Sequence, residues 1–171
     1  MNETTIIKAL LRNRSIFKAL LTDIPKEEYL WKSSPKKWCI LEIVCHLYDE
    51  EMEDFRARTQ HVLDTPQKEL PAIDPSAWVQ ERKYIQKDYA YMLHKFLEER
   101  KQSVAWLQSL VAPQWDNATE HHKFGAMTAK MFLANWLAHD YLHIRQILKV
   151  KFDYTQQLND EHLTYAGTWN D

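Results

Sequence analysis

Residues 128–150 read TAKMFLANWLAHDYLHIRQILKV, a stretch in which no proline or glycine interrupts a dense series of apolar side chains. On a helix, with about 100° per residue, these apolar side chains fall on nearly every side instead of forming one stripe. A helix that is apolar all round is normally buried by several neighbours. The stretch therefore predicts a central helix around which the remaining helices pack.

Six prolines divide the rest of the chain, because a proline inside a helix removes a hydrogen-bond donor and clashes with the preceding turn. In the first three proline-free stretches, apolar residues recur at steps of three and four, the spacing of a helix with one buried face. We expect Thr4 to cap the first helix, residues 34–35 to begin the second, and residues 112–113 to end the third. The four candidate helical stretches are 1–24, 36–65, 76–112 and 114–171.

Glycine is nearly absent. The 171 residues include only Gly125 and Gly167, whereas average usage of about 7% would give about a dozen. Rossmann fingerprints, P-loops and nucleophile elbows all need glycines, so the sequence excludes them. Hairpin-rich β folds need Asn-Gly or Asp-Gly turns, and the sequence has neither. The scarcity of glycine indicates an all-α chain.

The length of the chain fits one domain, 1–171, with a core large enough to be stable without disulfides. Two connections, residues 62–76 and 112–127, are longer than the roughly 2–8 residues usual between bundle helices. The tail, residues 151–171, is polar and then aromatic, and we expect it to pack back on the body. The predicted fold is an all-α four-helix bundle with two long connections.

The charges are balanced, since 22 Lys and Arg against 24 Asp and Glu give a net charge of −2. A basic footprint is missing, so we expect no nucleic-acid partner. Residues 1–4 lack a positive signal-peptide region, and no apolar run approaches the roughly 18 residues of a membrane span. Cys39 and Cys45, if on one helix, lie about 9 Å apart along its axis, too far for a disulfide. These observations predict a reduced, cytoplasmic protein without a membrane partner.

Histidines are the candidate chemical groups, and the chain has eight. His61, His94 and His162 fit surface positions, because they lie near a helix end, on a charged helix face or in the polar tail. His121 and His122 are adjacent in the second long connection. Adjacent histidines in a loop are usually at the surface, although such a loop could cover a site.

The spacing of three other histidines is typical of a metal site. His139 and His143 are four residues apart on the predicted central helix, so their rings lie on one face and can hold one ion. His46 lies on the second helix, opposite its apolar stripe. A histidine from one helix with a pair from another is a geometry that bundles use for metals, and three histidines leave open coordination positions. The same residues could also form a hydrogen-bonded structural cluster, and spacing alone does not choose.

Polar residues near these histidines are candidates for a supporting role. Glu42, Asp49 and Glu53 share the helix face of His46, where they could accept a hydrogen bond from its ring or simply be solvated. Glu42 and Asp49 are also candidate general bases. Gln146 lies on the face of His139 and is a candidate for orienting the reacting groups.

Two sequence blocks carry a family resemblance. Residues 38–47, WCILEIVCHL, are similar to the W-[ST]-x-x-E-x-x-x-H-L signature of the DinB/YfiT-like family, with Cys39 where Ser or Thr is commoner. Residues 137–147, LAHDYLHIRQI, resemble the second signature of that family, H-x-x-x-H-x-[GR]-Q. Their order and the about 90 residues between them also fit, as do DFRAR at 54–58 and YAGTW at 165–169. The resemblance covers most of the chain.

The resemblance implies an up-down-down-up four-helix bundle, often a homodimer. It implies that His46, His139 and His143 bind nickel, zinc or another divalent metal, with water completing the shell. Some relatives are S-transferases or isomerases that use a low-molecular-weight thiol, one was proposed as a metal hydrolase, and many have no known activity. Arg145 stands where many relatives have glycine. Its guanidinium could bind an anionic substrate or pair with an acid on a neighbouring helix.

Three hypotheses about function follow. As an enzyme, the protein would use the ion to activate a thiol for S-transfer or water for hydrolysis of a small-molecule substrate. As a non-catalytic bundle, it would bind metal for sensing, storage or interaction. As a purely structural cluster, the three histidines would only support the core. The resemblance makes metal binding a firmer expectation than any one reaction.

Overall fold

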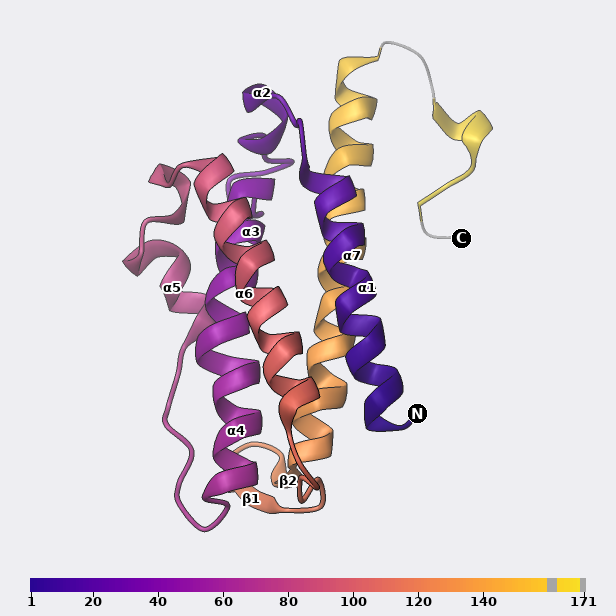
Figure 1. The fold of residues 1–171 in the computed structure, drawn as a ribbon. Coiled ribbons are helices and arrows are strands. Elements are labelled where there is room, and N and C mark those ends of the chain that lie inside the picture. The colour runs from indigo at the N-terminus through magenta and orange to yellow at the C-terminus, as the bar shows by residue number, and fades with distance from the viewer. Residues whose placement is uncertain (160–162, 170–171) are drawn as a thin grey trace.

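The computed structural model describes residues 1–159 and 163–169, and four long helical stretches form its body (Figure 1). The second stretch is one continuous helix whose middle is a π-helical segment. Successive stretches run up, down, down and up, so the expected all-α four-helix bundle is confirmed (Figure 1). The stretches are α1 (Glu3–Leu21), α3–η1–α4 (Ile40–Asp49, Glu50–Arg56 and Ala57–Asp64), α6 (Tyr89–Ser109) and α7 (Ala129–Leu158).

Short elements occupy the connections between these helices. Because α4 and α6 both run downward, the chain after α4 must return along the whole bundle, which explains the length of the first connection (Figure 1). The second connection contains an antiparallel hairpin, in which Ala118 pairs with Thr128 and His121 with Gly125. The short elements are α2 (Lys26–Tyr29), α5 (Pro75–Glu81), η2 (Tyr84–Gln86), β1 (Ala118–His121), β2 (Gly125–Thr128) and η3 (Leu163–Ala166).

The hairpin was not expected, since the sequence lacks Asn-Gly and Asp-Gly turns. Its turn instead uses Gly125 at a φ of +70°, a left-handed conformation that costs glycine little. One of the two glycines therefore sits where the backbone requires it.

The predicted helix starts need correction, because side-chain caps decide them. Asn2 and not Thr4 caps α1, with its side chain accepting from the backbone NH of Thr5 at 2.9 Å. The second helix begins at Ile40 and not at residues 34–35, because the Glu42 carboxylate accepts from the backbone NH of Cys39 at 2.9 Å. Such contacts satisfy amide groups that have no partner within the helix.

The predicted third helix, residues 76–112, is also divided. Lys83 adopts a left-handed φ of +50°, which ends the first part of the stretch. The long helix α6 then starts where the Asp88 side chain accepts from the backbone NH of Tyr91 at 2.7 Å. It ends at Ser109, three residues before the predicted stop at residues 112–113.

The tail differs in part from the expectation. Helix α7 continues to Leu158, so residues 151–158 are helical. The Trp169 ring lies 5.4 Å from the ring of Phe152 and 5.7 Å from Nζ of Lys149, so the end of the tail contacts α7, but Tyr165 is fully exposed. His162 lies outside the described residues.

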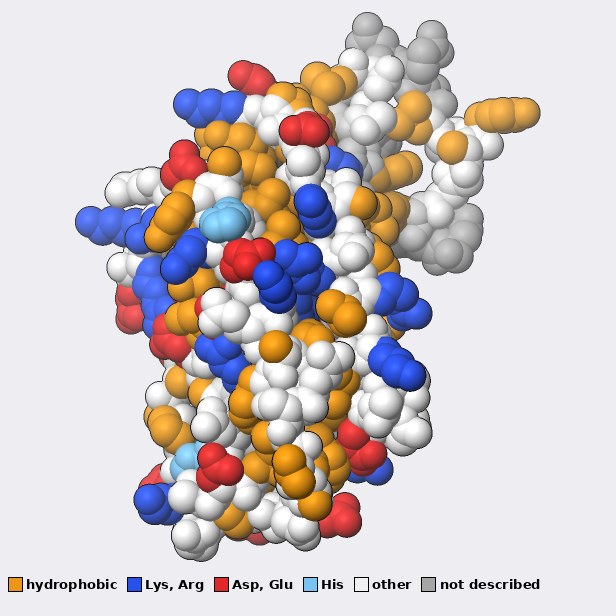
Figure 2. Space-filling model, viewed as in Figure 1, with side chains coloured by type: hydrophobic (Ala, Val, Ile, Leu, Met, Phe, Trp, Pro, Cys, Tyr) orange, Lys and Arg blue, Asp and Glu red, His pale blue; other side chains and the backbone are white. Residues whose placement is uncertain are grey.

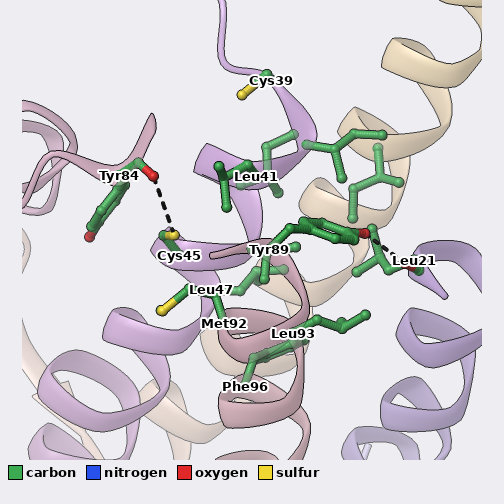
Figure 3. Packing of buried hydrophobic residues seen from close by; sticks show 14 of the residues in the cluster. Leu21, Cys39, Leu41, Cys45, Leu47, Tyr84, Tyr89, Met92, Leu93 and Phe96 are labelled. Carbon is green, nitrogen blue, oxygen red and sulfur yellow. Dashed lines mark hydrogen bonds between the residues drawn. The ribbon is translucent and has the colours of Figure 1, made fainter. Parts of the chain in front are cut away.

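The larger apolar cluster lies between α1, α3 and α6. Figure 3 shows Tyr89 beside Leu21, whose carbonyl accepts from the tyrosine hydroxyl at 2.6 Å. Phe17 of α1 meets Phe96 of α6 edge to face at 5.2 Å. Cys39 and Cys45 are free and buried, and burial raises their thiol pKa values to about 11 and about 12. These thiols therefore serve as small core residues.

Arg100 of α6 links the four stretches at their centre. Its guanidinium binds Glu51 of η1 through two hydrogen bonds of 2.8 Å and Asp140 of α7 through two of 2.7 Å. Asn13 of α1 donates to Asp140 at 3.0 Å, and the Trp136 indole NH donates to Glu51 at 2.9 Å. Burial alone would lower the pKa of Arg100, but the two carboxylates raise it, so the guanidinium stays charged.

The surface mixes both signs of charge. On the face shown in Figure 2, Lys and Arg side chains are interspersed with Asp and Glu. None of the described helices combines the length and the apolarity that crossing a bilayer would require.

We predict that Arg100→Met destabilises the fold by about 3–5 kcal/mol, because Glu51 and Asp140 are then buried without a counter-charge. Lys101→Met, on the neighbouring exposed residue, should change the unfolding free energy by less than about 0.5 kcal/mol. Urea denaturation measures both variants. Adding Glu51→Gln and Asp140→Asn to Arg100→Met should recover part of the loss. A loss below about 1 kcal/mol for Arg100→Met would contradict the assigned role.

Candidate metal centre

The structure brings together the three histidines singled out in the sequence. The Nε2 atom of His139 lies 3.3 Å from Nε2 of His46 and 3.0 Å from Nε2 of His143. One possible ligand atom from each residue lies within 4.8 Å of the others, and this is the one such metal-ligating group found in residues 1–159 and 163–169. His46 comes from α3, and the other two are one turn apart on α7.

The surroundings of the three rings shield most of the cluster from water. His46 and His143 are buried and His139 is partly buried. The ring of Trp38 lies 4.8 Å from that of His46, and the ring of Phe55 lies 4.9 Å from that of His139. The helix face of His46 taken by itself indicated a polar surface. In the structure this face is buried, as is every residue from Ile40 to Leu47, because α3 has neighbours on all sides.

The three imidazoles are neutral at pH 7. Burial, together with the proximity of other histidines, lowers the pKa of His46 to about 3 and that of His139 to about 2. Burial also lowers the pKa of His143, an effect that its hydrogen bond with Gln146 opposes. Neutral imidazole is the protonation state that binds a metal ion.

Gln146 fixes the ring of His143. Its Oε1 atom lies 2.8 Å from Nδ1 of His143, and a carbonyl oxygen accepts hydrogen bonds, so the proton of this ring is on Nδ1. The lone pair on Nε2 then points to the centre of the cluster. Gln146 was expected to orient the reacting groups, and the contact observed is instead with the ring of His143.

The spacing of the nitrogen atoms fits a divalent ion. Four ligands around a tetrahedral ion, with bonds of about 2.0–2.1 Å, are about 3.3 Å apart. The two Nε2 separations of 3.3 and 3.0 Å are close to this value. Moreover, hydrogen bonds alone do not satisfy all three nitrogen atoms. The Nε2 atom of His139 lies close to two other Nε2 atoms, but it carries at most one proton and can therefore donate to only one of them. The three residues could therefore hold a metal ion.

The carboxylates expected around His46 have other partners. Glu42 binds Lys32 at 2.7 Å, in addition to capping α3. Asp49 accepts from the hydroxyl of Tyr84 and binds Arg82, which also holds Glu53 at 2.7 Å. None of the three makes a hydrogen bond or ion pair with a histidine within residues 1–159 and 163–169, so the geometry does not support them as ring acceptors or general bases.

The sequence analysis missed the acid nearest to His46. Glu50 Oε1 lies 3.9 Å from Nδ1 of His46, a buried atom without a hydrogen-bond partner among the described residues. Burial, with neighbouring Asp54, raises the pKa of Glu50 to about 9. Asp54 in turn lies 2.9 Å from Nε of Arg58, whose Nη2 donates to the carbonyl of Pro71 at 3.0 Å. The spacing of four residues between His46 and Glu50 was the available signal.

A cavity of about 810 Å³ lies against the centre and includes His139 in its wall. It is lined by residues 54–58 of the second helical stretch, residues 69–75 of the returning connection, the hairpin and α7. His121 and His122 of the hairpin line it, so the second long connection forms part of the wall of the cavity beside His139. The cavity lets a small molecule approach one of the three histidines.

Other residues singled out in the sequence lie away from the centre. His94 is exposed, as expected, and His61 is partly exposed, with its ring bound to the carbonyl of Lys68 at 3.0 Å. Arg145 is exposed and forms no ion pair within the described part of the chain. The expected pairing of Arg145 with an acid on a neighbouring helix is therefore not seen.

The fold and the histidine cluster together define a class, a four-helix bundle with a candidate three-histidine metal centre between α3 and α7. Residues 9–147 match the sequence profile of the DinB superfamily. The chain belongs to that superfamily, which confirms the resemblance seen in its two sequence blocks. No curated protein matches the chain.

A solved structure has the same fold. The chain is similar to YfiT from Bacillus subtilis, described as "a probable metal-dependent hydrolase with an unusual four-helix bundle topology". The TM-score is 0.78 at 18% sequence identity, over 90% of this chain and 87% of YfiT. At this identity the likeness shows the fold.

We predict that the metal-free protein loses stability as the pH falls below about 6.5. The folded-state pKa of His46, about 3, lies below its unfolded value of about 6.5, so the unfolded chain takes up this proton first. Between pH 7.5 and 5.5 this costs about 1.4 kcal/mol. In EDTA, wild type should therefore lose about that much more unfolding free energy than His46→Gln. Equal losses in the two proteins would contradict the assignment.

Proposed function

We propose that the protein is a metal-dependent hydrolase of small molecules, with a divalent ion, zinc or nickel, held by His46, His139 and His143. The observation that carries the proposal is the convergence of three neutral, largely buried imidazoles, in which Nε2 of His139 lies 3.3 Å from Nε2 of His46 and 3.0 Å from Nε2 of His143. The description of YfiT as a probable metal-dependent hydrolase supports the reaction class.

The chain's own residues prepare the site. Burial holds the imidazoles in the neutral form, and Gln146 keeps the lone pair of His143 directed inward. When bound, the divalent ion supplies Lewis-acid chemistry and makes water a nucleophile near neutral pH. Three protein ligands leave a coordination position open, as catalytic sites require.

The substrate binds in the cavity beside His139. Its wall includes His139 but neither of the other two histidines, so a molecule in the cavity approaches the centre from the side of α7. The rings of Trp38 and Phe55 cover other parts of the cluster. The burial of His46 and His143 strengthens electrostatic interactions within the site.

We predict one equivalent of metal per chain in protein purified without a histidine tag and loaded with zinc or nickel. His139→Ala should retain less than about 0.1 equivalent, because two remaining ligands bind weakly. His94→Ala, which removes an exposed histidine, should retain the full equivalent. At a free metal concentration about 1,000 times the Kd, the wild type should gain about 4 kcal/mol of unfolding free energy. Elemental analysis and urea denaturation measure these effects.

The loaded protein should also hydrolyse members of a panel of aryl esters and amides, and His139→Ala should lose at least about a hundredfold in kcat/KM. Turnover that requires an added low-molecular-weight thiol would overturn the hydrolase in favour of an S-transferase. Metal binding without turnover in either assay would leave a non-catalytic metal-binding bundle. Absence of metal from the loaded wild type would overturn the metal centre itself.

We predict that Gln146→Leu weakens metal binding by about 10- to 100-fold, the usual effect of removing the partner of a histidine ligand. The substitution leaves the three ligands in place but removes the acceptor for Nδ1 of His143. Gln146→Glu, which keeps an acceptor, should bind within about tenfold of the wild type. Competition with a chromophoric chelator measures the affinities. Unchanged affinity in Gln146→Leu would show that this contact does not support the ligand.

A further inference from the structure

The cavity beside His139 has mainly apolar walls. Phe55, Phe132 and Leu142 come from the helices, Leu70 and Ile73 from the returning connection, and Met127 from the hairpin. Its volume of about 810 Å³ lies within the roughly 300–1,000 Å³ of pockets that bind drug-sized molecules. The walls offer a ligand apolar contacts on several sides.

The charged groups of the cavity are either paired or in water. Arg58 is buried, and its Nε lies 2.9 Å from the carboxylate of Asp54, so the two charges offset each other. The guanidinium also donates to the carbonyl of Pro71 at 3.0 Å. Glu69, Glu120 and Lys123 are the other Asp, Glu, Lys or Arg residues of the wall among the described residues, and all three are exposed. A bound ligand therefore meets no unpaired buried charge from these residues.

We propose that this cavity is the substrate pocket and that it selects an uncharged, largely apolar small molecule, with the bond to be cleaved beside His139. The proposal rests on the proposed function for the position of the reacting bond. An apolar ligand gains by leaving water for these walls. A charged ligand loses its hydration and finds no free buried counter-charge to offset that loss.

This selectivity bears on the reaction. A low-molecular-weight thiol that carries carboxylates, as glutathione does, would enter the cavity at the cost of desolvating those charges. An uncharged ester or amide would enter the cavity without this cost. The composition of the walls therefore favours hydrolysis over transfer to a charged thiol.

Two fluorescent probes with the same ring skeleton test the proposal in metal-free protein. N-phenyl-1-naphthylamine is uncharged, and 8-anilinonaphthalene-1-sulfonate carries one negative charge. We expect one uncharged molecule to bind per chain, at least about tenfold more tightly than the sulfonate. Leu142→Trp should weaken this binding at least about tenfold by filling the cavity, whereas Leu148→Trp, on the same helix but outside the cavity wall, should leave it within about twofold.

Asp54→Asn tests the role of the paired charge. It leaves the guanidinium of Arg58 without its carboxylate, so the sulfonate should bind about tenfold more tightly than to the wild type, and the uncharged probe within about twofold. Circular dichroism verifies that each variant is folded.

Several outcomes would overturn the proposal. These are absence of saturable binding, binding unaffected by Leu142→Trp, a sulfonate that binds the wild type as tightly as the uncharged probe, or no gain for the sulfonate in Asp54→Asn. Because these measurements are made in EDTA, they are independent of metal loading. Failure of the pocket and failure of the metal centre are therefore distinguishable.

Discussion

A single buried guanidinium fixes how the four helical stretches sit against one another. Arg100 joins α6 to η1 and α7, and Asn13 brings α1 into the same network through Asp140. The network has direct consequences for the candidate site, because Asp140 follows His139 and is three residues before His143 on α7. The rotation of α7 that places Asp140 on Arg100 also sets the direction of both histidines. On the second helical stretch, Glu51 likewise limits how η1 can rotate.

The π-helical segment determines which residues of the second stretch face inward. Each residue of a π-helix turns the chain less than a residue of an α-helix does, so positions four apart remain closer to one face than in a long regular helix. His46, Glu50, Asp54 and Arg58 are spaced by four across this segment, and successive members interact. The series leads from the histidine cluster to the wall of the cavity. The local helical irregularity thus connects the two parts of the site.

The bundle and the three histidines could be predicted because their signals are local and repeated. Apolar periodicity and prolines predicted the helices, and the two sequence blocks selected His46, His139 and His143. The helix starts at Ile40 and Tyr89 were missed, because each depends on one backbone NH that donates to the carboxylate of Glu42 or Asp88. The partners of the carboxylates were missed for a different reason. Contacts such as Arg100 with Glu51 join residues about 50 apart in the chain, and a helical wheel does not show them.

The burial of both cysteines makes the chain unusually convenient for labelling. Cys39 and Cys45 are the only cysteines in the sequence, and with thiol pKa values of about 11 and about 12 they carry almost no thiolate at neutral pH. Alkylating reagents attack the thiolate, so the native protein presents little that they can modify. A cysteine introduced on the surface of the hairpin would then be the preferred target. A spectroscopic label could report on the hairpin without any change to the native sulfur atoms.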